Sequence, residues 1–179
     1  MTIIIYDTET TGLLAPMAAS IDYQPYLVEL YCIKFDMNME RLDSLHVRCK
    51  PPISIPPDAT KIHGITDADV SECRSFAYYL SSIAELFTGC RIMVGHNENF
   101  DKMIIYYELL RIGKQLNFPW AMHSICTAEW SRVTLGIRMN LTDLHTYLFS
   151  EGFSGAHSAS VDCEMTAKCY VELCRRGMV

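Results

Sequence analysis

The chain has 179 residues, half of them hydrophobic, and a formal net charge of −6. This length and apolar content fit a substantial core, so we expect a single domain over residues 1–179. The acidic balance argues against a protein that holds nucleic acid through bulk positive charge, although bound metal ions can supply positive charge locally.

The cysteine pattern predicts free thiols rather than a zinc or redox site. The eight cysteines stand at positions 32, 49, 73, 90, 126, 163, 169 and 174 and form no C-x-x-C pair. Scattered thiols are typical of a reducing compartment. The sequence shows no targeting segment and no apolar run of membrane-spanning length, so we expect a soluble cytoplasmic protein with no membrane partner.

The first half of the chain predicts strands joined by loops. Apolar and β-branched runs favour strands over residues 3–7, 26–36 and 42–50. A loop over 14–25 separates the first two strands, and a hairpin at 36–40 joins the second to the third. Four prolines between residues 51 and 57 predict an extended, irregular passage.

The second half predicts helices that alternate with short strands. An apolar stripe at helical spacing begins near Ser75 and ends at Gly89. The remaining elements are strands over 91–94 and 122–126 and helices over 98–112, 141–149 and 158–175. Three strands followed by alternating helices and strands predict an α/β domain with a mixed sheet.

Two carboxylates at the end of the first strand are the strongest chemical signal. Asp7 and Glu9 are two positions apart, so their side chains point to the same face of a strand. The ends of strands are where open α/β sheets place their sites. Two neighbouring carboxylates repel each other unless a cation lies between them, so the pair predicts a hard divalent metal.

Two further segments place polar side chains at helix starts. Asp101 lies one turn into a helix that Asn97 would cap, and we expect it to face outward at the edge of the sheet. His157 precedes the last helix and Asp162 lies in its first turns. Each has an ordinary explanation, because acids suit helix N-termini and a histidine before a helix is commonly a surface residue.

Four segments together resemble the DEDDh subgroup of the DEDD 3′-5′ exonuclease superfamily (DnaQ-like, RNase T-like). They are D-T-E-T-T-G-L over 7–13, H-G-I-T over 63–66, H-N-E-N-F-D over 96–101, and His157 with Asp162. The motifs follow the family's order and cover nearly the whole chain. The resemblance implies a ribonuclease H-like α/β fold, with a mixed five-stranded sheet flanked by helices.

The resemblance also implies catalysis by Asp7, Glu9, Asp101, His157 and Asp162. The four acids would hold two divalent cations, Mg²⁺ or Mn²⁺, which suit an all-oxygen ligand set. Asp7 would bridge both ions, Glu9 and Asp162 would complete the site that binds the attacking water, and Asp101 would serve the second ion. His157 would be the general base, because an unperturbed histidine titrates at about pH 6.5.

Substrate contacts are implied for the turn after the first motif. Thr10, Gly12 and Leu13 would hold the terminal nucleotide, since Gly12 allows close approach of the backbone. Asn97 would bind substrate, with helix capping as an equal explanation. His63 is interpreted as stabilising a turn or as partly buried, with a hydrogen bond near the substrate entrance as the alternative.

The three basic residues near these motifs have two interpretations. Lys102, Arg132 and Arg138 are interpreted as solvated surface residues, and phosphate contact is the alternative. The aromatic residues are interpreted as core rather than as base-stacking positions.

The predicted function is a metal-dependent 3′-to-5′ exonuclease acting on 3′ ends of single-stranded DNA or frayed DNA, releasing nucleoside 5′-monophosphates. An exoribonuclease acting on short or single-stranded RNA is the alternative, because the sequence has no feature that separates the two sugars. An inactive nucleic-acid-binding module is more remote, because the four acids and His157 are all present. The sequence identifies no protein partner.

Overall fold

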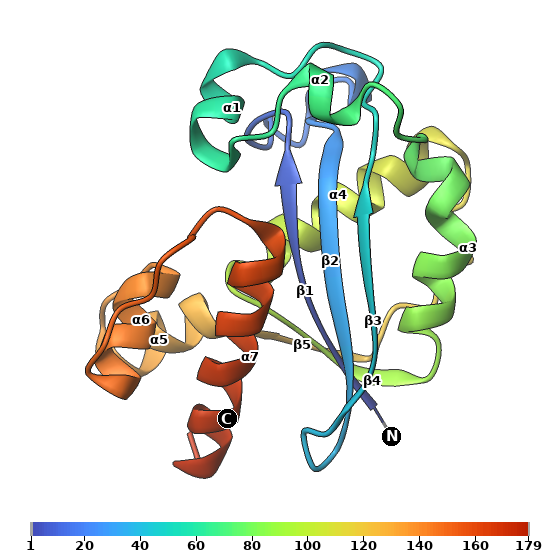
Figure 1. Cartoon of the computed structure of the whole chain (residues 1–179). Helices are drawn as coiled ribbons and strands as arrows, with labels where there is room; N and C mark the ends of the chain where they lie inside the picture. The colour runs from blue at the N-terminus through green and yellow to red at the C-terminus, as the bar shows by residue number, and fades with distance from the viewer. Residues whose placement is uncertain (1, 179) are drawn as a thin grey trace.

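The computed structural model describes residues 2–178 and contains a mixed five-stranded sheet with strand order β3-β2-β1-β4-β5 (Figure 1). The strands are β1 (Thr2–Thr10), β2 (Leu27–Asp36), β3 (Arg41–Arg48), β4 (Cys90–Gly95) and β5 (His123–Cys126). β2 is antiparallel to β1 and β3, whereas β4 is parallel to β1 and to β5. The predicted α/β fold with a mixed five-stranded sheet is confirmed.

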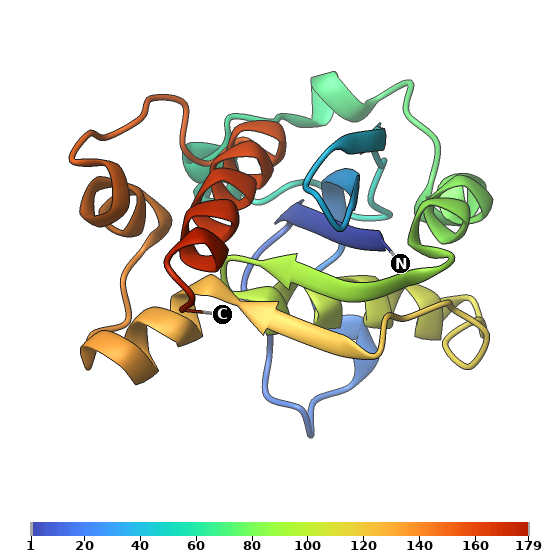
Figure 2. The ribbon, with the colours of Figure 1, turned by 90° about the horizontal axis from the view of Figure 1, so that it is seen from below.

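Helices cover both faces of this sheet, as the view along it shows (Figure 2). α3 (Phe76–Phe87) and α4 (Glu98–Arg111) pack on one face, and α7 (Ala159–Arg175) packs on the other. The remaining helices are α1 (Pro57–His63), α2 (Asp67–Val70), α5 (Thr127–Leu135), α6 (Leu141–Phe149) and the 3₁₀ turn η1 (Ile21–Tyr23). α5 and α6 lie beside α7, and α1 and α2 cover the end of the sheet where β1 stops.

The side chains of β1 alternate between the two cores. Ile3 and Ile5 are buried with α7, whereas Ile4 and Tyr6 are buried with α3 and α4. Continuing the same alternation sends Asp7 and Glu9 to the α7 face and Thr8 to the α4 face. The apolar start of the strand therefore fixes the direction in which its polar end points.

β1 extends further than β4, its parallel neighbour. The β1–β4 pairing ends at Ile5 opposite Val94, while the β1–β2 pairing continues to Thr10. The last residues of β1 therefore have one free edge, on the side where α4 begins. The predicted first strand, which stops at residue 7, is too short, because the polar residues after it still pair with β2.

Several predicted boundaries are wrong for local reasons. Residues 57–63 form α1 rather than an irregular passage, because Pro57 occupies the first helical position, where its missing N–H is not needed. α5 is absent from the prediction because its buried face includes Thr127 and Ser131, which break the apolar periodicity. α6, by contrast, has the predicted bounds, with Asn140 accepting a hydrogen bond from the Asp143 backbone at its start.

Two further observations bear on the environment of the chain. All eight cysteines are free, as the spacing predicts, and five of them are buried. In the part of the chain that the structure describes, no helix is long and apolar enough to cross a membrane.

Candidate active site

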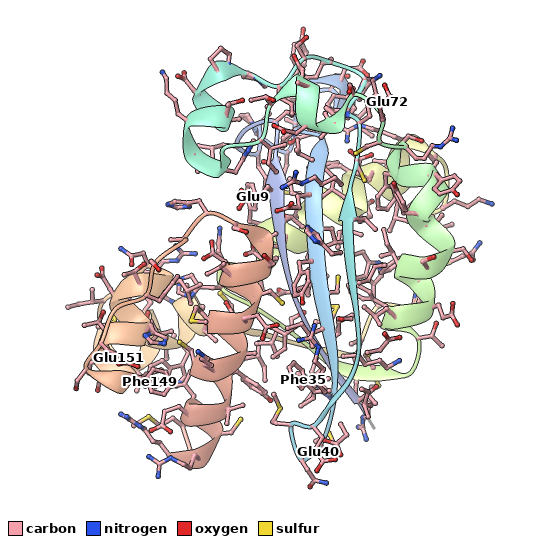
Figure 3. All side chains as sticks on the ribbon, viewed as in Figure 1. Glu9, Phe35, Glu40, Glu72, Phe149 and Glu151 are labelled. Carbon is pink, nitrogen blue, oxygen red and sulfur yellow. The ribbon has the colours of Figure 1, made fainter. Side chains whose placement is uncertain are left out.

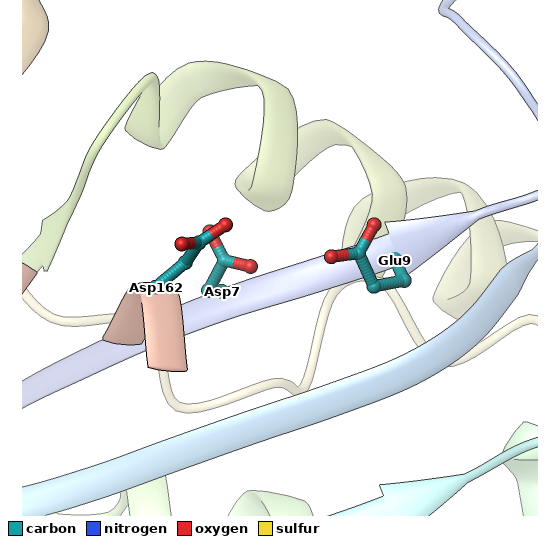
Figure 4. Close-up of side chains that lie close together, drawn as sticks. All are labelled: Asp7, Glu9 and Asp162. Atoms are coloured by element: carbon teal, nitrogen blue, oxygen red, sulfur yellow. The ribbon is translucent and has the colours of Figure 1, made fainter. Parts of the chain in front are cut away.

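Three carboxylates converge where the polar end of β1 meets the start of α7. One oxygen each from Asp7, Glu9 and Asp162 lies within 4.8 Å of the others (Figure 4). Figure 3 shows Glu9 near the end of β1, between the start of α7 and the segment containing α1 and α2. The predicted convergence of Asp7 and Glu9 is present, and α7 adds a third acid from the far end of the chain.

Packing of α7 explains why Asp162 reaches this point. Cys163, the next residue, is buried on the sheet, and its Sγ donates to the Ile5 carbonyl at 3.2 Å. Ala167 and Tyr170 continue the same buried face. With this face fixed against β1, the preceding Asp162 side chain is directed along the strand toward Asp7.

The cluster is electrostatically unfavourable without a cation. Burial, followed by the charges of Asp162, Glu29 and Asp101, raises the pKa of Glu9 to about 8. Burial and the charges of Asp101, Asp162 and Glu9 raise the pKa of Asp7 well above its usual value. Burial also raises the pKa of Asp162. These carboxyls therefore favour either protons or a bound positive charge.

One carboxylate oxygen of the cluster is free to bind a divalent cation. Oδ1 of Asp162 is buried and has no hydrogen-bond partner among residues 2–178. Its Oδ2 accepts the His157 backbone N–H at 2.9 Å. An unpartnered buried carboxylate oxygen beside two more carboxylates fits a hard cation, since such ions take oxygen ligands.

Asp101 lies on the opposite side of β1 and does not face outward. The prediction is wrong because the side chain is 3% exposed and fills the free edge of β1. Its Oδ1 accepts both the Thr8 backbone N–H (3.0 Å) and the Thr8 hydroxyl (2.7 Å). Burial nevertheless raises the pKa of Asp101 to about 7, against these two hydrogen bonds. Sequence spacing did not reveal this pairing, in which Asp101 accepts from the Thr8 backbone N–H in place of a neighbouring strand.

His157 differs from the carboxylates in being exposed. It precedes α7 with a left-handed backbone (φ 68°), and its backbone N–H is tied to Asp162. The imidazole therefore lies at the surface beside the acidic cluster, with only the backbone anchored. Ser158 is the residue before α7, but its side chain does not cap the helix.

Glu29 of β2 supplies the missing cap and was given no role from the sequence. Its Oε2 accepts the backbone N–H of Ala159, the first residue of α7, at 3.3 Å. Its Oε1 contacts Arg48 at 2.7 Å and His46 at 3.0 Å. Burial alone would raise the pKa of Glu29, but these two partners lower it. An acid within the apolar run of β2 was the signal that could have identified it.

A largely apolar cavity of about 540 Å³ opens beside Glu9. Residues 8–13 form one wall and α1 forms another. The Thr10 hydroxyl donates to the Gly12 carbonyl at 2.7 Å and closes the turn, and Leu13 is 84% exposed at the rim. His63 joins the two walls, because its Nδ1 accepts from Ile65 N–H (3.0 Å), which leaves Nε2 to donate to the Thr10 carbonyl (3.2 Å).

Asn97 precedes α4 but does not cap it through its side chain. It has a left-handed backbone (φ 77°) and makes no side-chain capping bond. Its Oδ1 instead accepts Nη2 of Arg138 at 2.6 Å. The capping explanation is therefore wrong, and Asn97 links the start of α4 to the segment between α5 and α6.

The fold and the acidic site define a ribonuclease H-like α/β domain of the nuclease type. The RNase_T family, described as Exonuclease, matches residues 4–170 of the chain. The chain therefore belongs to the RNase_T exonuclease family, which confirms the predicted membership of the DEDD 3′-5′ exonuclease superfamily.

Known relatives agree with this assignment. The chain is 27% identical over 175 residues to the DNA polymerase III subunit epsilon of Haemophilus influenzae, covering 94% of this chain and 65% of that protein. A zinc-bound complex of Escherichia coli ExoI with single-stranded DNA superposes with a TM-score of 0.76 at 20% identity, over 98% of this chain and 41% of that one. The nuclease domain of 3′hExo, a DEDDh family member bound to rAMP, gives 0.76 at 14% identity, covering 99% and 93%.

Proposed function

We propose that this chain is a single metal-dependent exonuclease domain that removes nucleoside 5′-monophosphates from the 3′ ends of single-stranded DNA. The observation that carries the proposal is the cluster of Asp7, Glu9 and Asp162, whose carboxylate oxygens lie within 4.8 Å and include an unpartnered buried atom. This arrangement needs positive charge, and hydrolysis of a phosphodiester needs the same charge at the reacting phosphate.

Two divalent cations, Mg²⁺ or Mn²⁺, would be held by the four acids. Asp7 would be shared by both ions, Glu9 and Asp162 would complete one site, and Asp101 would serve the other. When bound, the cations would neutralise charge on the scissile phosphate and favour ionisation of the attacking water. The two hydrogen bonds from Thr8 hold the Asp101 carboxylate in place before any ion binds.

His157 is proposed as the general base that accepts the proton of the attacking water. Its exposure keeps the imidazole accessible, and its backbone bond to Asp162 keeps it beside the cluster. A general base needs to reach the attacking water only when substrate is bound, so an accessible imidazole suits this role. In this proposal, proton transfer depends on His157, which is more exposed than the four acids.

The terminal nucleotide is proposed to occupy the cavity beside Glu9. Thr10 and Gly12 would bring the backbone close to it, and Leu13 would contact its base from the rim. Asn97 is proposed to bind substrate together with Arg138, to which it is hydrogen-bonded. Single-stranded ends fit the net charge of −6, which disfavours extended binding along a duplex.

RNA is the second candidate substrate. The solved relatives include complexes with single-stranded DNA and with rAMP, so the shared fold serves both sugars in those proteins. The relatedness to DNA polymerase III epsilon subunits favours DNA and raises a polymerase as a candidate partner.

The free cysteines support a reducing compartment, the cytoplasm.

The test uses DNA and RNA oligonucleotides of one sequence, labelled at the 5′ end, with Mg²⁺, with Mn²⁺ or with EDTA. We expect a ladder that shortens from the 3′ end, faster for DNA, and no products in EDTA. A matched oligonucleotide blocked by a 3′-terminal inverted nucleotide should resist. Failure to degrade any free 3′ end would overturn the function, and faster loss of RNA would reverse the substrate assignment.

A further inference from the structure

The catalytic carboxylates stand between two cavities. Glu9 lines the 540 Å³ cavity beside α1, and Asp162 lines a second cavity of about 320 Å³ beside the start of α6. Asn140, Ala156 and His157 also line the second cavity. An enzyme that cuts the last phosphodiester bond must hold a nucleotide on each side of that bond, and the structure has a cavity on each side of its acids.

An arginine lies close in sequence to the residues that line the second cavity. Arg138 lies two residues before Asn140, and its Nη2 donates to Asn97 Oδ1 at 2.6 Å. The following residue, Met139, is held through its backbone, which donates to Ser131 Oγ at 3.0 Å and is hydrogen-bonded by His96. The segment that carries Arg138 is therefore attached both to α5 and to the start of α4.

Arg138 retains unused donors and forms no ion pair among the described residues, although its charge adds to the Arg132 hydrogen bond and charge in lowering the pKa of Glu129. Arg132, the nearby arginine of α5, is paired with Glu129 at 2.8 Å. Among the described residues, no carboxylate lies within ion-pair distance of Arg138, and its side chain is exposed. A guanidinium carries five N–H donors in a fork that matches a phosphate, and the bond to Asn97 occupies Nη2.

We propose that the second cavity and Arg138 form a subsite for the nucleotide that precedes the terminal one, an inference that rests on the proposed nuclease function. The nucleoside lies in the cavity, and Arg138 binds the phosphate on its 5′ side. The phosphate lies on the Arg138 side and not inside the cavity, because the Asp143 carboxylate lines it and already accepts from Asn140 Nδ2 at 2.8 Å.

The test compares three thymidine substrates under identical cation conditions. Thymidine 5′-(p-nitrophenyl phosphate) has only the terminal nucleotide, d(TpT) adds the second nucleoside, and d(pTpT) adds the 5′ phosphate that Arg138 would bind. Wild type should show kcat/KM for d(pTpT) roughly tenfold above that for d(TpT), as expected for one charge-assisted contact. Arg138→Gln should lose this preference, and Arg138→Lys should restore part of it.

Arg175→Gln is the matched control, because it removes an exposed arginine of α7 that is already paired with Glu172 at 2.7 Å; it should retain the full preference for d(pTpT). Circular dichroism and thermal melting establish that each variant is folded. Equal kcat/KM for the two dinucleotides in wild type, or a preference that survives Arg138→Gln, would overturn the subsite. Failure of wild type to hydrolyse any of the three substrates would overturn the nuclease function itself, so the two failures are distinguishable.

Discussion

The two sides of the acidic cluster are built in contrasting ways. Asp7 and Glu9 belong to a strand whose apolar half is fully buried, and Asp101 is fixed by two hydrogen bonds from Thr8. His157 lies in an exposed segment and is tied to the cluster through its backbone N–H alone. The difference teaches that the groups which would hold charge are set in place by folding, whereas the proposed base keeps freedom to move.

The largest expected effect comes from the buried side. Asp7→Asn preserves shape but removes a carboxylate that interacts with Asp101, Asp162 and Glu9, so we expect kcat on single-stranded DNA to fall by roughly a thousandfold or more. The same change should raise the melting temperature in EDTA, because it relieves repulsion with Asp101 and Asp162. Asp43→Asn, an exposed change on β3, serves as the control, and full activity in Asp7→Asn would contradict the site.

The exposed side should respond differently. We expect His157→Gln to lower kcat by roughly a hundredfold or more, the usual contribution of a general base. Mn²⁺ affinity by calorimetry and the melting temperature should stay at their wild-type values, because the exposed imidazole holds no buried contact. His123→Gln, an exposed histidine on β5, is the control. A His157→Gln enzyme with wild-type kcat would exclude this residue as the base.

The third expected effect is on stability against pH. Burial raises the pKa of Glu9 from 4.5 to about 8, so the folded protein binds more protons than the unfolded chain between these values. Stability in EDTA should therefore fall as pH rises from about 5 to 8, and each 1 kcal/mol lost lowers the melting temperature by roughly 2–4 °C. Mn²⁺ should flatten this dependence, and Glu9→Gln should reduce it, since the raised pKa values of Asp7 and Asp101 act in the same direction. A melting temperature that rises over this range in EDTA would contradict the electrostatics of the cluster.

The sequence predicts only part of the buried side of the site. The spacing of Asp7 and Glu9 within a β-branched run is local information, and the structure places both side chains on the α7 face. The burial of Asp101 cannot be predicted from the local sequence. It depends on β4 ending before β1 and leaving a free strand edge that the carboxylate fills.

The same reasoning explains two other outcomes. α6 has the predicted bounds because a capping Asn140 and its apolar stripe both lie within the segment. The role of Glu29 could not be assigned because its partners come from β3 and from α7, far away along the chain. Contacts of this kind are determined by packing between elements, which periodicity does not report.

Glu29 provides the smallest and most specific test, since it joins the rigid sheet to the start of α7. Two carboxylates connect the β2–β3 pair to this helix: Glu29 is buried and accepts from Ala159, whereas Glu164 is only partly buried and pairs with the exposed Arg41 at 2.9 Å. We expect Glu29→Gln to lower the free energy of unfolding by about 1.5–3 kcal/mol, the range for a hydrogen bond to a charged group. Glu164→Gln should cost less, about 0–1 kcal/mol, because exposed ion pairs contribute little.

Urea denaturation of the two variants measures this difference, and kcat reports its consequence for the site. Because Ala159 lies between His157 and Asp162, weakening its bond to Glu29 should lower kcat in Glu29→Gln, by less than His157→Gln does, while Glu164→Gln keeps the wild-type value. Equal effects of the two substitutions on stability and on kcat would mean that the start of α7 is positioned by its apolar face alone. Cys163 and Ala167 would then be sufficient to bring Asp162 to the strand, and the buried carboxylate of β2 would have no part in joining the two sides of the site.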